Sequence, residues 1–572
     1  MPPRILVGPI RNPSQIGAWG QDPHLRVFTY PESWPVRAQF PDALVYEPGH
    51  STLHDLLRQM PAEAQPDVVL WWHHYSPLPL DMALCPCLSV LIVADSHAQL
   101  GNILDLSQAF DLVVGDLVLV DILRQKGVQA EFWPAFSYDS QVYFPLETVE
   151  RELDIAFVGS FKFHPLRNAL LYRLSQLSER YQVYIDDQTY GADYNALLNR
   201  SKIVVNYSIR KEINLRSYEA ARCGALLFYE AGNLETPLIL PPGECAVVYD
   251  WQNLEAKLDW YLAHPRALAA LALAGQERIQ LFSYEKQFAW LLESIAVYLQ
   301  KKRQSRPWSR FSAWQQAQIQ AVNLYQHESA QARACALRVL EQSLQTVAQP
   351  LSSSFWNTLA LVYLCQAPPD FQAARACLTA VPPGDLQTQY HLAWLSFLEK
   401  DYTQAYAQGL AVLAMPFSAA QFAVAELYSR AYLPYGFNFA ALFREKLWSQ
   451  TEQGDAHLAV RQYELLLWNT ALLCGQICLG QAAYAQAKAH FLQAWTLLPQ
   501  LGETSFLLAF CQAAQTDYAS AFDWAWQGLA QNPLQKEAWL YLDAWLTQAG
   551  DAETRHTKGQ ILQKIKSALP HF

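Results

Sequence analysis

The residues with the clearest potential for chemistry lie in the segment 197–227, which reads LLNRSKIVVNYSIRKEINLRSYEAARCGALL. We expect it to form a strand, a loop, a helix and a second strand, placed at Ile203–Asn206, 207–213, Asn214–Gly224 and Ala225–Tyr229. In a parallel sheet, the loop between a strand and the next helix lies at the carboxyl edge. There the first turn of the helix directs free backbone N–H groups and its positive end outward. The segment therefore predicts a binding site for a diphosphate.

A second group of polar residues follows predicted strands in the first 100 residues. The strands are Ile5–Gly8, Val68–Trp72 and Val90–Ala94, and the residues at their ends are Gly8, His73, His74, Asp95 and His97. Sites of α/β proteins are built at such strand ends. Asp95 or His97 could act as the general base on an acceptor hydroxyl, and Gly8, His73 and His74 would lie on the acceptor side. The alternative for the two histidines is that they pack beside Trp71 and Trp72.

The first 300 residues alternate between short apolar runs and helical patterns. Beside those already named, the runs are Leu112–Val114, Glu131–Pro134, Asp154–Gly159, Gln182–Ile185 and Ala246–Tyr249. Helical patterns lie between them, for example at Thr52–Gln59 and Asp116–Lys126. This alternation is typical of parallel sheets with helices on both faces. We expect two successive doubly wound units, joined near Phe144-Pro145.

After a short basic stretch at 300–310, the chain is nearly all helical pattern and contains a repeat. Tyr484, Ala487, Phe491 and Pro499 recur as Tyr518, Ala521, Ala525 and Pro533, each 34 residues later. The period and the spacing resemble tetratricopeptide (TPR) repeats, with weaker copies near Phe371 and Tyr402. Such helix pairs stack into a solenoid with a concave side. An ordinary helical bundle is the alternative, and for the basic stretch a solvated linker is favoured over a nucleic-acid patch.

A family resemblance rests on the same segments. Residues 216–224, Arg-Ser-Tyr-Glu-Ala-Ala-Arg-Cys-Gly, resemble the donor-binding motif of glycosyltransferases of the GT-B architecture, and most closely that of the CgeB-like, "glycosyl transferases group 1" branch. Asp154–Ser160 is similar to the first strand and glycine loop of the donor domain, and 258–284 is similar to the closing helices. The ordered set, over about residues 1–300, carries the resemblance.

The resemblance, together with the 34-residue repeat, implies the fold class and the domain organisation. The fold would be α/β followed by all-α, with two Rossmann-like domains (GT-B) and a C-terminal TPR-like helical solenoid. We expect an acceptor-side domain at 1–145, a donor nucleotide-sugar domain at 146–300, a linker at 301–318 and the repeats at 319–572.

The resemblance also implies roles for individual residues. Glu219 would accept hydrogen bonds from the ribose hydroxyls of the donor, and Asn214 and Leu215 would offer backbone N–H groups to the diphosphate. Cations would stabilise the charge of the leaving group, and an arginine fork fits phosphate oxygens well. The remaining donor-side candidates are Gly159, Ser160, Lys162, Arg167 and Arg216. Solvated surface cations are the alternative for Lys162 and Arg216.

One position departs from the pattern of related retaining families. They carry a further Glu eight positions before the later one, and here Lys211 stands at that position, with Glu212 beside it. A lysine cannot make the same contact with a donor sugar. The departure motivates a second hypothesis, in which the transferase half no longer catalyses and the chain is an interaction scaffold.

Composition excludes several other classes of protein. With 52% hydrophobic and 16% charged residues the 572-residue chain is not disordered, and a net charge of −11 disfavours general nucleic-acid binding. Ten cysteines are too sparse for a disulfide scaffold, and Cys85-Pro86-Cys87 lacks a second pair at zinc spacing. No secretory signal, membrane span, metal or cofactor is expected. We predict a cytoplasmic, metal-independent transferase whose partners are a nucleotide sugar, an acceptor protein or glycan, and a protein bound by the repeats.

Overall fold

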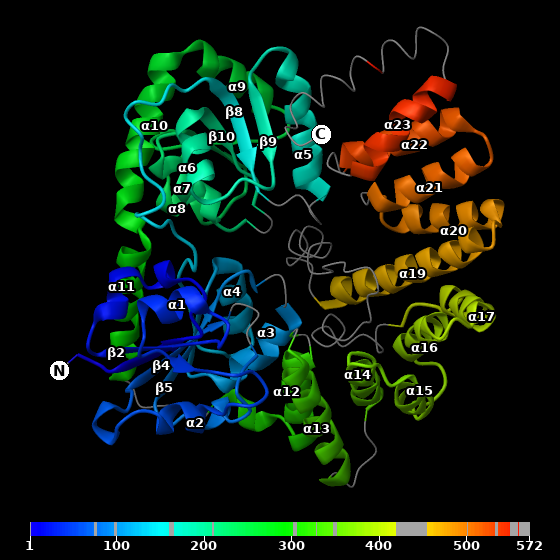
Figure 1. Ribbon diagram of the computed structural model, residues 1–572, viewed down its shortest axis with the longest axis horizontal. Coiled ribbons are helices and arrows are strands. Elements are labelled where there is room, and N and C mark those ends of the chain that lie inside the picture. The colour runs from blue at the N-terminus through cyan, green and yellow to red at the C-terminus, as the bar shows by residue number, and fades with distance from the viewer. Residues whose placement is uncertain are drawn as a thin grey trace. The chain divides into compact units, whose positions relative to one another are not determined.

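The computed structural model describes residues 2–73, 77–96, 100–159, 165–208, 211–300, 306–325, 327, 329–346, 352–418, 455–499, 502–531, 536–549 and 559. The chain divides into two compact units (Figure 1). Unit 1 holds the residues up to 141 together with 280–383, and unit 2 holds 142–279 together with the described residues from 384 onward.

The core of unit 1 is a seven-stranded parallel sheet in the order β3-β2-β1-β4-β5-β6-β7. The strands are β1 (Ile5–Gly8), β2 (Leu25–Thr29), β3 (Leu44–Val45), β4 (Val68–His73), β5 (Leu88–Val93), β6 (Leu112–Gly115) and β7 (Ala130–Phe132). The helices between them are α1 (Trp34–Gln39), α2 (Leu53–Arg58), α3 (Leu100–Leu106) and α4 (Leu117–Gln125). Strand β1 has the bounds that its apolar run predicts, whereas β2 and β3 were not anticipated. The doubly wound arrangement follows from strands that are apolar on both sides.

Both faces of the first sheet are covered, and one of them by a helix from much later in the chain. Alternate residues of β1 and β4 point to opposite faces, so Val7 and Leu70 belong to a different hydrophobic cluster from Leu6 and Val69. Phe288, Leu291 and Ile295 of α11 (Tyr284–Leu299) pack into the cluster of Val7 and Leu70. The sequence-based boundary at 300 assigned this helix to the donor domain, but its buried face lies in unit 1.

The basic stretch after α11 is attached to the first sheet by a buried ion pair. Arg306 donates from Nε and Nη2 to the two carboxylate oxygens of Asp111, at 3.1 and 2.8 Å, and from Nη1 to the carbonyl of Ala83 at 2.5 Å. The side chains of Arg306 and Asp111 are only 10% and 8% exposed. Trp308 follows and is buried in the cluster of Leu6 and Val69. Part of the expected linker therefore packs against the domain. It leads into the helices α12 (Ala313–Tyr325), α13 (Ala330–Thr346), α14 (Ser353–Leu364) and α15 (Phe371–Thr379).

Unit 2 contains a five-stranded parallel sheet in the order β12-β11-β10-β8-β9. The strands are β8 (Leu153–Val158), β9 (Val183–Asp186), β10 (Ser201–Val205), β11 (Leu226–Glu230) and β12 (Val247–Tyr249). The helices of this part are α5 (Pro165–Gln176), α6 (Gly191–Arg200), α7 (Leu215–Arg222), α8 (Thr236–Ile239), α9 (Leu254–Ala263) and α10 (Pro265–Ile279). Each predicted strand of this sheet is present within one or two residues. The α/β class of the first part of the chain is confirmed.

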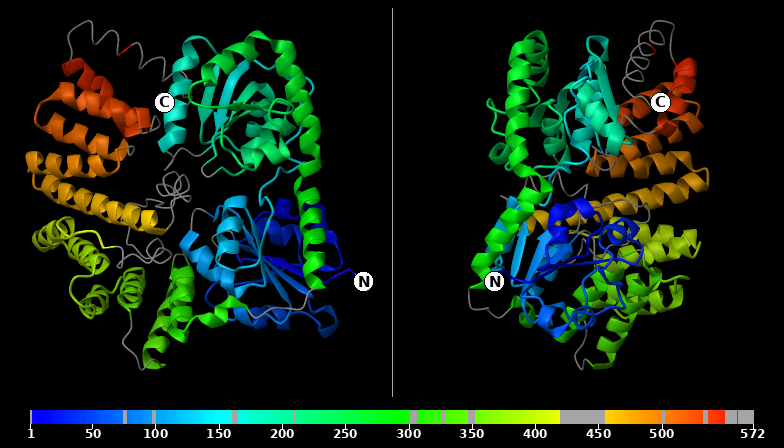
Figure 2. Two further views of the ribbon diagram at one scale, coloured as in Figure 1. Left: turned by 180° about the vertical axis from the view of Figure 1, so that it is seen from behind. Right: turned by 60° about the vertical axis from the view of Figure 1, so that its left-hand side comes forward.

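The rest of unit 2 is helical, as expected. Its helices are α16 (Leu386–Leu398), α17 (Tyr402–Leu413), α19 (Asp455–Gly480), α20 (Tyr484–Leu497), α21 (Gly502–Ala514), α22 (Tyr518–Gln531) and α23 (Lys536–Ala549), and successive helices pack against one another (Figure 2). The second helix of each pair begins at an aromatic residue, Tyr402, Tyr484 or Tyr518. At Gly475, an added Cβ would lie 2.4 Å from the ring of Phe491, so the two helices cross closely at that point. Pro533 and residues 419–454 lie outside the described residues.

No described helix is both long enough and apolar enough to cross a bilayer.

Arg306→Ala should destabilise the protein strongly, because it leaves Asp111 buried without its cation. We expect a loss of about 3 kcal/mol or more in the free energy of unfolding. Arg310→Ala is the matched control, since Arg310 is exposed on the same basic stretch and should change the free energy by less than about 0.5 kcal/mol. Urea unfolding of the full chain, followed by tryptophan fluorescence, measures both. Equal midpoints for the two variants would show that the ion pair contributes nothing.

Candidate functional site

The candidate site lies at the carboxyl edge of the second sheet. Strands β8, β10 and β11 are neighbours, so the residues that follow them meet at one edge. These residues are Gly159 after β8, Asn206 after β10, and Glu230 at the end of β11. Helix α7 starts from the same edge, after the loop that leaves β10. Within this loop, residues 209 and 210 lie outside the described part of the chain.

Arg216 joins the ends of two strands to the start of α7. Its Nε donates to the carbonyl of Val158 and its Nη1 to Oδ1 of Asn206, both at 2.7 Å. The guanidinium lies 4.0 Å from the centre of the Phe157 ring, and the residue is 7% exposed. Burial lowers the pKa of Arg216, and neighbouring tyrosine and carboxyl groups oppose that shift. Arg216 is therefore an interior cation built into the edge, and the solvated alternative is wrong.

Gly159 has the backbone that this arrangement requires. Its φ is +150°, a conformation that side chains disfavour, and an added Cβ would lie 1.9 Å from Nη2 of Arg216. Only glycine therefore allows the arginine to approach the end of β8 this closely.

Glu219 occupies the second turn of α7, because the helix begins at Leu215. A first-turn acid could be explained by its interaction with the helix dipole alone, and this position excludes that alternative for Glu219. The carboxyl group is hydrogen-bonded to Tyr143 and Tyr194, whose rings meet edge to face at 5.9 Å, and the residue is 7% exposed. Burial raises the pKa of Glu219 to about 7, while Arg216 and the two tyrosine hydroxyls act in the opposite direction. A carboxylate has about four lone-pair positions, so two hydroxyls leave room for further donors.

The amino end of α7 has no side-chain cap. Asn214 is the N-cap residue, but its side chain makes no capping hydrogen bond, and its buried Oδ1 has no hydrogen-bond partner among the described residues. The Oγ of Ser217 in the first turn is likewise buried, with no partner in the described part of the chain. Leu215 is 38% exposed. The N–H of Ser217 donates to the carbonyl of Asn214 at 3.1 Å, so within the described part of the chain the N–H groups of Leu215 and Arg216 are the ones left for an anion at this helix end.

The other donor-side candidates fall in two groups. Arg167 on α5 is 5% exposed and donates from Nε and Nη2 to the carbonyl of Tyr207, at 3.0 and 2.7 Å. Its guanidinium lies 5.9 Å from the Phe157 ring, so it shares that ring with Arg216. Ser160 and Lys162 lie outside the described residues, and their roles stay predictions.

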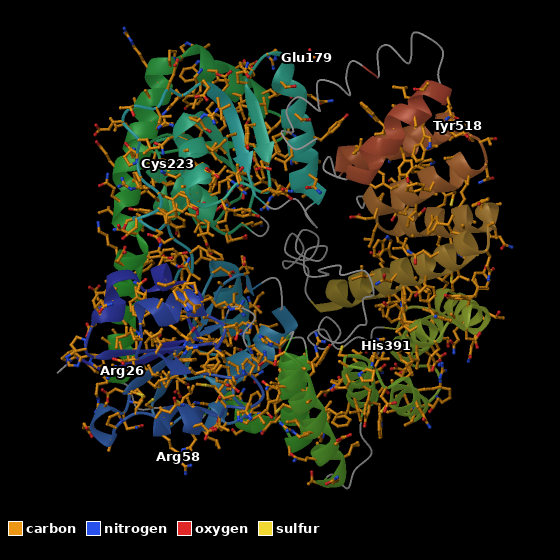
Figure 3. All side chains as sticks on the ribbon, viewed as in Figure 1. Arg26, Arg58, Glu179, Cys223, His391 and Tyr518 are labelled. Atoms are coloured by element: carbon orange, nitrogen blue, oxygen red, sulfur yellow. The ribbon has the colours of Figure 1, made fainter. Side chains whose placement is uncertain are left out.

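The helix ends as predicted, with Cys223 as its C-cap residue and Gly224 at a φ of +75°. Cys223, labelled in Figure 3, donates from Sγ to Oδ1 of Asn195 at 3.1 Å. Burial raises the pKa of this thiol to about 12, and the nearby Glu219 adds to the shift. Cys223 is therefore an inert packed thiol behind the candidate site.

The acceptor-side candidates lie in unit 1 and are only partly described. Gly8 ends β1, and an added Cβ there would lie 2.3 Å from the carbonyl oxygen of Phe28, so strand packing is enough to require glycine. His73 ends β4 and is 2% exposed. Asp95 follows β5 in a left-handed conformation, with a φ of +50°. His74 and His97 lie outside the described residues.

Sequence reasoning missed the residues that hold the loop before α7. Asn233 donates from Nδ2 to the carbonyl of Glu212 at 3.0 Å, Leu234 donates its N–H to the carbonyl of Lys211 at 2.8 Å, and Glu235 accepts from the N–H of Ile213 at 3.0 Å. A partial signal was available, because Asn233 and Glu235 are polar residues that come shortly after the buried strand β11. In the part of the chain that is described, no group of three or more His, Cys, Asp or Glu is placed to hold a metal ion.

A comparison with protein families finds a match that includes the residues of the candidate site. Residues 144–293 match a family model described as "Glycosyl transferase-like". Among curated proteins, the sequence has no match.

Solved structures similar to this chain include a sucrose-phosphate synthase from Thermosynechococcus elongatus, with 12% identity and a TM-score of 0.37 over 52% of this chain and 100% of that one. Anabaena HepE in complex with UDP has 12% identity and a TM-score of 0.39 over 51% and 99% of the two chains. The pneumococcal O-GlcNAc transferase GtfA, in complex with UDP and GlcNAc, has 8% identity and a TM-score of 0.32 over 41% and 57%.

The Glu219 carboxyl should make stability depend on pH. Its folded pKa of about 7 lies above the ordinary 4.5, so its contribution is fully present below pH 4.5 and is lost as the pH rises through 7. Glu219→Gln removes this titration. From pH 5 to pH 8 the wild type should therefore lose roughly 3 kcal/mol relative to the variant. Urea unfolding at both pH values measures the difference, and a constant difference between the two proteins would contradict the buried acid.

Proposed function

We propose that this chain is a glycosyltransferase that moves a sugar from a nucleoside-diphosphate donor to an acceptor hydroxyl, with the diphosphate bound at the amino end of α7. The observation that carries the proposal is the uncapped start of this helix, which lies within the 144–293 match. Among the residues that the structure describes, the buried side-chain oxygens of Asn214 and Ser217 have no partner there, as expected of a site that awaits a ligand.

The chain's own groups supply the chemistry in this proposal. The N–H groups of Leu215 and Arg216 at the start of α7 face the charge that develops on the leaving diphosphate, and Arg216 and Arg167 place two fixed cations at the same edge. Gly159 leaves the space that the Arg216 guanidinium occupies beside the end of β8. Glu219 accepts from the ribose hydroxyls with the lone pairs that the tyrosines leave free. Asp95 or His97 remains the proposed base for the acceptor, and the helices from Leu386 onward are proposed to bind an acceptor or partner protein.

A second candidate function rests on Lys211. This residue is exposed, with a φ of +67°, where the resembled families place a carboxylate. A scaffold whose transferase half binds no donor would explain this replacement.

Donor binding by the full chain separates the two functions. We expect UDP or another nucleoside diphosphate to raise the thermal midpoint, and Glu219→Ala to weaken binding at least about tenfold, because two hydrogen bonds to the ribose are lost. Glu219→Gln tests the same contact without opening a cavity, and Glu244→Ala is the control, since Glu244 is an exposed acid of the same unit. Calorimetric titration measures the affinities. If no nucleotide binds the wild type, or if Glu219→Ala binds as well as Glu244→Ala, the proposal is refuted.

A further inference from the structure

Glu230 is a partly buried acid that the donor site as described so far does not use. It ends β11 at the carboxyl edge of the sheet, where it pairs in register with Tyr249 of β12. Its Oε1 accepts from the hydroxyl of Ser208 and from Nδ2 of Asn233, the latter at 2.8 Å. Its Oε2 is buried and has no hydrogen-bond partner among the described residues. Oε1 of Glu230 thus accepts two hydrogen bonds, whereas its Oε2 accepts none from the described residues.

The contacts of Oε1 help to hold the loop that leads to α7. Asn233 also donates to the carbonyl of Glu212, and Ser208 lies at the start of the loop that leads to α7. Glu230 is therefore connected to the start of this loop through Ser208 and to its later part through Asn233, which binds Glu212. These contacts fix the carboxyl group, so the direction of Oε2 is set before any ligand binds.

The charge of Glu230 affects groups that also belong to the proposed donor site or contact it. It favours the cationic form of Arg216, and with burial it raises the pKa of Tyr249, whose hydroxyl donates to the carbonyl of Asn206 at 2.7 Å. Burial in turn raises the pKa of Glu230 itself. Glu230 is thus an electrostatic neighbour of Arg216 at the edge where we place the diphosphate.

The Oε2 atom of Glu230 is suited to bind a ligand that carries a hydroxyl group. A carboxylate repels phosphate and accepts hydrogen bonds from hydroxyl groups. A buried polar atom without a partner is costly, and a ligand hydroxyl would relieve that cost. Lys211, by contrast, has an ammonium group that only donates, and it lies exposed at the place where a sugar-binding acid was expected.

We infer that Glu230 is a specificity-determining residue that binds a hydroxyl of the donor's transferred sugar through Oε2, in place of the acid that Lys211 replaces. The inference rests on the proposed function. It assigns the donor sugar to the end of β11, next to the diphosphate at α7, and leaves the ribose to Glu219.

Titration of the full chain with UDP and with UDP-sugars tests this inference. Glu230→Gln keeps an oxygen for Ser208 and Asn233 but replaces the free acceptor by a donor amide. We expect it to weaken the best-bound UDP-sugar about ten- to a hundredfold, while the affinity for UDP changes less than about twofold. Glu244→Gln should change neither affinity. Thermal unfolding of each variant checks that it folds.

Deoxy analogues of the sugar provide a second measurement on the wild type. Removing the recognised hydroxyl should weaken wild-type binding by a similar factor and should have little further effect on Glu230→Gln. The inference is overturned if Glu230→Gln loses UDP and UDP-sugar equally, if it loses neither, or if every deoxy analogue binds the wild type normally. It is also overturned if UDP binds but no UDP-sugar binds better. If the wild type binds no nucleotide at all, the proposed function has failed instead.

Discussion

The guanidinium of Arg216 holds the candidate site together. It donates to the end of β8 and to the residue after β10, it stacks on Phe157, and it lies so close to Gly159 that no side chain fits there. Because Arg216 belongs to the first turn of α7, the start of this helix is fixed against the carboxyl edge of the sheet. This contact directs the first N–H groups of α7 toward a ligand bound at that edge.

A second layer of contacts fixes the loop that precedes the helix. Asn233, Leu234 and Glu235 hold its backbone at three successive residues, and Glu230 anchors Ser208 at its start. The loop is therefore ordered by the segment after β11 and not by its own sequence. Such preorganisation lowers the cost of ordering the site when a ligand binds.

Local signals in the sequence predicted much of this architecture. The strand at Ile5–Gly8 could be located from its apolar run, and the end of the helix at Cys223-Gly224 from its glycine. Both signals depend only on residues that are adjacent in sequence. Strand β2 was missed because its place between β3 and β1 depends on pairing with strands that its own sequence does not reveal. The attachment of α11 to the first sheet was missed because an amphipathic pattern shows that a face is buried and not what covers it.

The site was predictable in outline, but the state of its side chains was not. The motif located Arg216 and Glu219 on the correct helix. Whether Arg216 is solvated or interior depends on Phe157, which is distant in sequence, and the burial of Glu219 depends on Tyr143 and Tyr194. Glu230 belongs to no motif that the sequence analysis recognised. It became a candidate only because the fold leaves its Oε2 without a hydrogen-bond partner among the described residues.

Hydrogen–deuterium exchange of the full chain, with and without UDP, tests the central claim most directly. The claim is that an anionic diphosphate binds to the free N–H groups at the start of α7. It predicts that UDP slows exchange in a peptide covering 214–219, with little change in a peptide from the middle of α10. Protection that is absent at 214–219, or that appears only elsewhere in the chain, would contradict it.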